Sequence, residues 1–166
     1  MRKVARRRPP EADLRNSLMV SEIVEKPEPT PPATEQRPTI LIVDDDPVLV
    51  ESLSRGLNRQ GFDTLSADSG KEGLARTRSE HPALIVLDLL LPDMDGFEIC
   101  RELDEASDTC GIPVIILSGM ERPDIIRRSR AVGCQYFVRK PCDPNALLVL
   151  IRQAINEVNG WSGVED

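Results

Sequence analysis

Polar side chains follow four apolar runs of this sequence, at the point where each run ends. A short, continuous apolar run is typical of a strand that is buried on both faces of a parallel sheet. The carboxyl ends of such strands share one edge of the sheet, where ligands bind. We therefore expect the side chains behind the runs to converge. The runs are 39–43, 83–87, 112–117 and 136–138, followed by Asp44 and Asp45, by Asp88, by Ser118 and by Lys140 respectively.

The three carboxylates of this set predict a divalent cation. Aspartates within a few ångströms of one another repel, because each has a reference pKa of roughly 4. Mg²⁺ takes hard oxygen ligands, keeps several waters and accepts oxygens from a phosphate. The Lys140 ammonium and the Ser118 hydroxyl would face the same phosphoryl group. These residue types predict phosphoryl transfer, with Asp88 as the nucleophile that forms an acyl phosphate.

Helices are predicted between the strands, and several begin at clear signals. Asp46 and Asp143 each stand before a proline, so that a capping carboxylate precedes a proline at the first helical position. Five strands that alternate with five helices predict an α/β fold, a doubly wound parallel sheet with right-handed crossovers. The expected helices cover 47–60, 69–79, 96–103, 123–132 and 144–158, and a further, alternating strand covers 62–67.

Charge and composition divide the chain of 166 residues into an amino-terminal extension and one domain. Residues 1–38 hold eight Lys/Arg and six Asp/Glu, whereas the remainder holds 13 basic and 22 acidic side chains, for a formal net charge of −7. An acidic body argues against general nucleic-acid binding. We expect a disordered, basic and proline-rich extension over 1–38, a folded domain over 39–160 and a short tail over 161–166.

Cysteine spacing and hydropathy exclude other classes of protein. The four cysteines form no Cys-x-x-Cys pair, and His81 is the only histidine. This pattern argues against a zinc site and for a reducing environment. No run reaches the roughly 18 apolar residues of a membrane span, and the basic amino end lacks an apolar signal core. We therefore expect a cytoplasmic protein.

Four motifs resemble the receiver domain of bacterial two-component response regulators. They come in the family's order and with its spacing, and the resemblance covers about residues 39–160. It implies a flavodoxin-like (βα)5 fold with strand order 2-1-3-4-5, of the single-domain type similar to chemotaxis regulators. The motifs are ILIVDDDP at 40–47, LIVLDLLLPDMDGFE at 84–98, PVIILSG at 113–119 and GCQYFVRKP at 133–141.

The resemblance implies a role for each site residue. Asp88 would be the phosphoacceptor, with Lys140 beside the phosphoryl group. Asp44 and Asp45 match the acidic pair that holds Mg²⁺ together with Asp88, and the backbone carbonyl of Leu90 would complete the protein ligands. The phosphoryl group would come from a histidine kinase or a histidine phosphotransfer protein. The implied protein is a signalling phosphoacceptor rather than an enzyme.

The switch residues implied by the resemblance are Ser118 and Phe137. The family's switch aromatic lies three positions before the lysine, which is Phe137 here, whereas Tyr136 stands one position earlier. Phenylalanine lacks the hydroxyl of a tyrosine. Gly119 occupies a position that is usually alanine, and the Lys140–Pro141 bond matches one that is often cis in the family.

Phosphorylation would draw Ser118 inward and let Phe137 fill the space, which changes the face built by the fourth helix, fifth strand and fifth helix. Arginines on that face favour a protein partner, whose identity the sequence leaves open. They are Arg122, Arg127, Arg128 and Arg130.

Two alternatives remain open. In the first, the basic arm at 1–15 contacts DNA or an acidic partner. The second is a haloacid-dehalogenase-like phosphatase, which also uses an aspartate nucleophile, a Ser/Thr, a lysine and an acidic pair. That family places its nucleophile early and a second aspartate two residues later, whereas position 90 is a leucine here.

Overall fold

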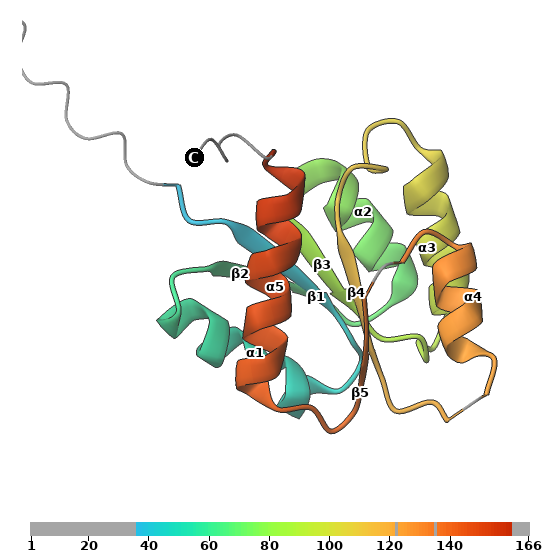
Figure 1. The fold of residues 1–166 in the computed structure, drawn as a ribbon, viewed down its shortest axis with the longest axis horizontal. Helices are drawn as coiled ribbons and strands as arrows, with labels where there is room; N and C mark the ends of the chain where they lie inside the picture. The colour runs from blue at the N-terminus through green and yellow to red at the C-terminus, as the bar shows by residue number, and fades with distance from the viewer. Residues whose placement is uncertain (1–35, 122, 135, 161–166) are drawn as a thin grey trace, which may run out of the picture. The chain divides into compact units, whose positions relative to one another are not determined.

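Five parallel strands form one sheet in the computed structural model, which describes residues 36–121, 123–134 and 136–160. The strand order is β2-β1-β3-β4-β5 (Figure 1). This order confirms the predicted fold class and topology. The strands are β1 (Thr39–Val43), β2 (Asp63–Ala67), β3 (Leu84–Leu87), β4 (Val114–Ser118) and β5 (Tyr136–Arg139).

Helices cover both faces of the sheet. Alternate residues of each strand point to opposite faces, so the apolar runs supply two separate cores. Helices α1 and α5 pack on one face around Ile42 and Ile115, and helices α2, α3 and α4 pack on the other around Leu41 and Ile116 (Figure 1). The helices are α1 (Pro47–Arg59), α2 (Gly70–Glu80), α3 (Gly96–Glu105), α4 (Ile125–Ala131) and α5 (Pro144–Val158).

Strand register brings the ends of the strands to one edge. Val43 pairs with both Ala67 and Leu87, so β1, β2 and β3 end level with one another. At the other side of the sheet Ser118 pairs with Arg139, so β4 and β5 also end together. The polar residues that follow the strands therefore lie along one carboxyl edge, as the sequence predicts.

Helix starts follow the predicted capping signals, with one exception. The Asp46 carboxylate accepts hydrogen bonds from the first turn of α1, and Asp143 does the same for α5. The sequence predicted that the fourth helix begins at Pro123, but α4 begins at Ile125 because Pro123 and Asp124 form a turn. Asp124 makes no side-chain capping bond to replace the missing turn.

Several expectations fall outside the described residues. These are residues 1–35 of the disordered extension predicted over 1–38, the DNA-contacting arm at 1–15, the tail over 161–166 and Arg122. Among the described helices, none is long and apolar enough to cross a membrane.

Candidate functional site

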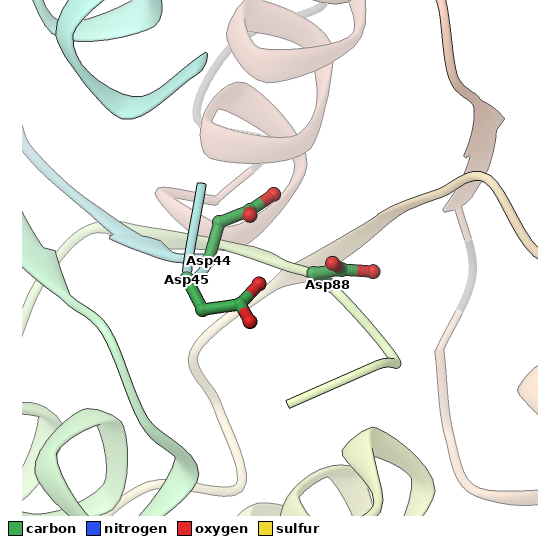
Figure 2. Close-up of side chains that lie close together, drawn as sticks. All are labelled: Asp44, Asp45 and Asp88. Carbon is green, nitrogen blue, oxygen red and sulfur yellow. The ribbon is translucent and has the colours of Figure 1, made fainter. Parts of the chain in front are cut away.

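Three carboxylates meet at the carboxyl edge of the sheet. Asp44 and Asp45 follow β1, and Asp88 follows β3, where its backbone N–H donates to the Val43 carbonyl at 2.9 Å. One carboxylate oxygen from each of the three lies within 4.8 Å of the others (Figure 2). Asp44 and Asp88 are only 4% and 7% exposed, whereas Asp45 faces solvent. The cluster is thus a shallow acidic site with one open side.

Lys140 brings a positive charge into this cluster. Its ammonium Nζ lies 2.5 Å from Asp44 Oδ2 and 3.2 Å from Asp88 Oδ2. The backbone places it there, because the Lys140 N–H donates to the Ser118 carbonyl and extends the β4–β5 pairing by one bond. The Lys140–Pro141 peptide bond is cis, as the resemblance implies. One lysine therefore bridges two of the three carboxylates.

Burial and charge set the protonation behaviour of this bridge. Desolvation by burial raises the pKa of Asp44, although its bonds to Lys140 and to the Asp46 N–H oppose the rise. Burial alone would lower the pKa of Lys140, but the hydrogen bond to Asp44 and the charges of Asp88 and Asp44 together outweigh it, and the pKa is raised. Lys140 is therefore held in its charged form by the carboxylates that it neutralises.

Ser118 and Phe137 lie beside the site on neighbouring strands. Ser118 ends β4, is fully buried, and accepts a hydrogen bond at Oγ from the Met120 N–H at 3.3 Å. Phe137 is half-buried on β5 and packs on the core shared with α4, while Tyr136 packs on the opposite core and its hydroxyl donates to Glu157 of α5. Of the two aromatic side chains, only Phe137 shares a face with α4.

The loop between β3 and α3 is anchored by Asp93, a residue that the sequence analysis did not single out. Its carboxylate accepts hydrogen bonds from the Gly70 and Lys71 N–H groups, at 2.7 and 2.9 Å. These backbone bonds lower the pKa of Asp93. The loop that follows Asp88 is thereby tied to the first turn of α2. No local signal could reveal this, since 23 residues separate Asp93 from Gly70.

A second anchor joins the same loop to α4. The Arg128 guanidinium lies 4.3 Å from the centre of the Phe97 ring and 3.8 Å from an oxygen of Asp95, the residue that caps α3. In the same loop, Gly96 lies so close to the backbone after β3 that a Cβ there would stand 2.6 Å from the Leu89 Cα. Arg128, which the sequence analysis assigned to a partner face, thus also makes contacts within the domain.

The donor set fits a magnesium ion. The residues at hand are carboxylates, which are the hard oxygen ligands that Mg²⁺ prefers, and Asp45 leaves one side open for waters and a phosphate. Two acidic groups held almost fully buried beside a third are costly unless a cation lies among them, and Lys140 reaches only Asp44 and Asp88. The site is therefore suited to bind a divalent cation next to Asp88.

Comparison with known proteins identifies the fold's relatives. The family model of the response regulator receiver domain matches residues 40–152. The chain is 36% identical over 116 residues to the DNA-binding response regulator MtrA of Mycolicibacterium smegmatis, covering 70% of this chain and 50% of MtrA. It is 32% identical over 116 residues to Protein PilH of Pseudomonas aeruginosa, covering 70% of this chain and 96% of PilH. The chain spans about half the length of several curated relatives that it matches, MtrA among them.

The solved structures that are similar to this chain are receiver domains as well. A CheY-like response regulator receiver domain protein from Methanospirillum hungatei matches with a TM-score of 0.70 and 29% identity, covering 74% of this chain and 97% of that one. The receiver domain of a histidine kinase from Syntrophus aciditrophicus matches with a TM-score of 0.70 and 32% identity, covering 78% and 98%. The chain therefore belongs to the response regulator receiver domains, the phosphoacceptor modules of two-component signal transduction.

Proposed function

We propose that Asp88 is the residue that accepts the phosphoryl group. The observation that carries this proposal is the convergence of Asp44, Asp45 and Lys140 on the Asp88 carboxylate. A carboxylate oxygen of Asp88 attacks the phosphorus of a phosphohistidine on a kinase or phosphotransfer protein. The phosphorus–nitrogen bond breaks, its electron pair leaves with the imidazole, and an acyl phosphate remains on Asp88.

The neighbouring side chains position and neutralise the charge of the transferred group. Lys140, already 3.2 Å from Asp88, would contact an oxygen of the phosphoryl group, and Ser118 would donate to another after its hydroxyl turns away from the Met120 N–H. Asp44, Asp45, Asp88 and the Leu90 carbonyl would hold Mg²⁺. When bound, this ion supplies positive charge to the phosphoryl oxygens.

We propose that Ser118 and Phe137 transmit the effect of phosphorylation from Asp88 to the surface of the domain. Phe137 lines a surface hollow of about 500 Å³ with Met120, Ile125 and Ile126 of the α4 face. Phosphorylation that draws Ser118 inward would favour the inward position of the Phe137 ring, and so change the surface formed by α4, β5 and α5. Arg127 and Arg130 are exposed on α4 and are candidates for contact with an effector protein.

For the whole protein we propose a cytoplasmic signalling phosphoacceptor rather than an enzyme, with a receiver domain over 39–160 between an extension and a short tail. This proposal rests on the family and on the four free thiols, which are typical of proteins from a reducing environment. The basic arm at 1–15 as a contact for DNA or an acidic partner stays a proposal as well. The comparisons give no support to a haloacid-dehalogenase-like phosphatase.

The phosphoacceptor is tested by labelling. The full chain, incubated with Mg²⁺ and acetyl phosphate, should gain one base-labile phosphoryl group by intact mass, and Asp88→Asn should gain none. Asp68→Asn is a matched control, because Asp68 follows β2 at the same edge but lies outside the cluster. If Asp88→Asn is labelled as fully as Asp68→Asn, the acceptor is another residue.

A further inference from the structure

Two free thiols lie against each other on the side of the sheet that carries α3 and α4. Cys100 belongs to α3, and Cys134 lies in the connection between α4 and β5. Their sulfur atoms are 2.9 Å apart, and the residues are only 2% and 4% exposed. The function proposed above uses neither thiol. Their contact joins segments that are 34 residues apart in the chain.

The backbone holds Cys134 close to α3. The Cys134 N–H donates to the Ser129 carbonyl at 3.0 Å, which fixes the turn after α4. Gly133 adopts a left-handed conformation, with φ of +81°, and a Cβ there would stand 3.0 Å from a carboxylate oxygen of Asp104 on α3. A disulfide needs a sulfur–sulfur distance of about 2.05 Å, so the two sulfurs must approach by only about 0.9 Å.

The pair lies beside a pocket large enough for a small oxidant. Cys100 and Cys134 line a pocket of about 230 Å³, together with Cys110, Thr109 and Tyr136. One water takes about 30 Å³ of liquid volume, so the pocket has room for several molecules the size of hydrogen peroxide. The hydrogen bond to Cys134 and burial both raise the pKa of the Cys100 thiol, which makes its oxidation slower than that of an exposed thiol.

We propose that Cys100 and Cys134 are a redox modification site, which hydrogen peroxide converts reversibly into an intramolecular disulfide. One thiol loses its proton and attacks a peroxide oxygen; the S–O bond forms, the O–O bond breaks, the leaving hydroxide takes up the thiol proton as water, and a sulfenic acid remains. The other sulfur then attacks the sulfenic sulfur, forms the S–S bond and releases a second water. Two thiols and one peroxide thus give one disulfide and two waters. A dithiol reductant reverses the change.

The disulfide would restrain the α4–β5 connection. It would tie α3, which follows the loop after Asp88, to Cys134, two positions before Tyr136, and so limit movement of α4. This consequence rests on the proposed switch, whereas formation of the disulfide does not. The two are therefore tested separately, and a failure of Asp88 to accept phosphate leaves the test of the disulfide unaffected.

The test uses the full chain and peptide mapping. Trypsin places each cysteine in its own peptide: Cys100 in 79–101, Cys110 in 102–127, Cys134 in 131–139 and Cys142 in 140–152, since the Arg122–Pro123 and Lys140–Pro141 bonds are not cut. After exposure to hydrogen peroxide and blocking of the remaining thiols, we expect peptides 79–101 and 131–139 to appear joined, with the loss of two hydrogens. Dithiothreitol should separate them. Peptides 102–127 and 140–152 should not be joined to any other.

Cysteine variants test whether the disulfide joins Cys100 and Cys134. Cys110→Ser should keep the joined peptide, while Cys134→Ser should lose it and leave Cys100 as a sulfenic acid that dimedone traps. Amide exchange in the α4–β5 connection should slow by roughly tenfold in the oxidised protein. Two results would overturn the proposal. In one, Cys110 is oxidised while Cys100 and Cys134 both stay free; in the other, the disulfide involves Cys110 or a second chain. The wild-type protein alone supplies this result, even if a buried variant fails to fold.

Discussion

Replacing Lys140 by methionine should destabilise the metal-free protein far more than replacing an ordinary surface cation. Lys140→Met keeps the apolar stem of the side chain and removes the charge that bridges Asp44 and Asp88. The two carboxylates are then left almost fully buried, with oxygens within 4.8 Å of each other and no ammonium between them. The folded state has to accommodate this repulsion, whereas the unfolded chain does not.

The size of the effect follows from the distances. Two unit charges 4.8 Å apart repel by about 3.5 kcal/mol at an effective dielectric constant of about 20. Removing one partner of a buried ion pair commonly costs about 3–5 kcal/mol. The Lys140 side chain is 23% exposed, so solvent screens part of the charge. We therefore expect a loss of about 2–4 kcal/mol in the free energy of unfolding.

Urea unfolding in EDTA and in Mg²⁺ measures this effect. A cation in the acidic cluster replaces the lost charge and binds only the folded state, so Mg²⁺ should recover at least half of the deficit. Arg139→Met is the matched control, because Arg139 is the neighbouring residue and pairs with Glu121 at an exposed site. Exposed pairs contribute about 0–1 kcal/mol. The control should change little under either condition.

Two results would refute this reasoning. In the first, Lys140→Met and Arg139→Met unfold in EDTA with free energies that agree within about 0.5 kcal/mol, which is the scatter of ordinary surface substitutions. In the second, Mg²⁺ stabilises Lys140→Met no more than it stabilises the wild type. The first result would mean that Lys140 does not neutralise the cluster, and the second that the cation does not take the place of the Lys140 charge among these carboxylates.

Three further predictions concern the site and its supports. Burial raises the pKa of Asp44 above 3.8, so its carboxyl adds stability below pH 4 that is lost as the pH rises through the folded-state pKa. In EDTA, wild type should therefore lose stability relative to Asp44→Asn as the pH is raised from about 4, and a constant difference would contradict the assignment. Gly96→Ala should cost about 1–3 kcal/mol in urea unfolding, because its Cβ would stand 2.6 Å from a backbone atom. Gly56→Ala, where a Cβ meets nothing within 4 Å, should instead add about 0.5–1 kcal/mol, and equal effects would refute the packing argument. Asp93→Ala should speed amide exchange in the first turn of α2 and leave amide exchange in α5 unchanged. Unchanged exchange in α2 would show that the Asp93 hydrogen bonds do not hold the loop to this helix.

The sequence alone was enough to predict the elements of this fold and the convergence of Asp44, Asp45, Asp88 and Lys140 at one edge of the sheet. Continuous apolar runs identify buried parallel strands, and Asp-Pro pairs identify helix starts, because both signals act over a few residues. The boundaries of α4 were less well predicted, since Pro123 is followed by an aspartate that does not cap. The residues behind the strands could be predicted to meet because parallel strands share a carboxyl edge.

Only the tertiary structure decided which of these residues touch. The Lys140–Asp44 contact spans 96 residues, and the register of β4 on β3 and β5 sets it. The same packing places Phe137 toward α4 and Tyr136 toward α5, and it brings Cys100 against Cys134. Residue types and periodicity specify local structure and the faces that are buried. Contacts between distant segments depend on how helices and strands pack in three dimensions, and that information is not local to any stretch of the chain.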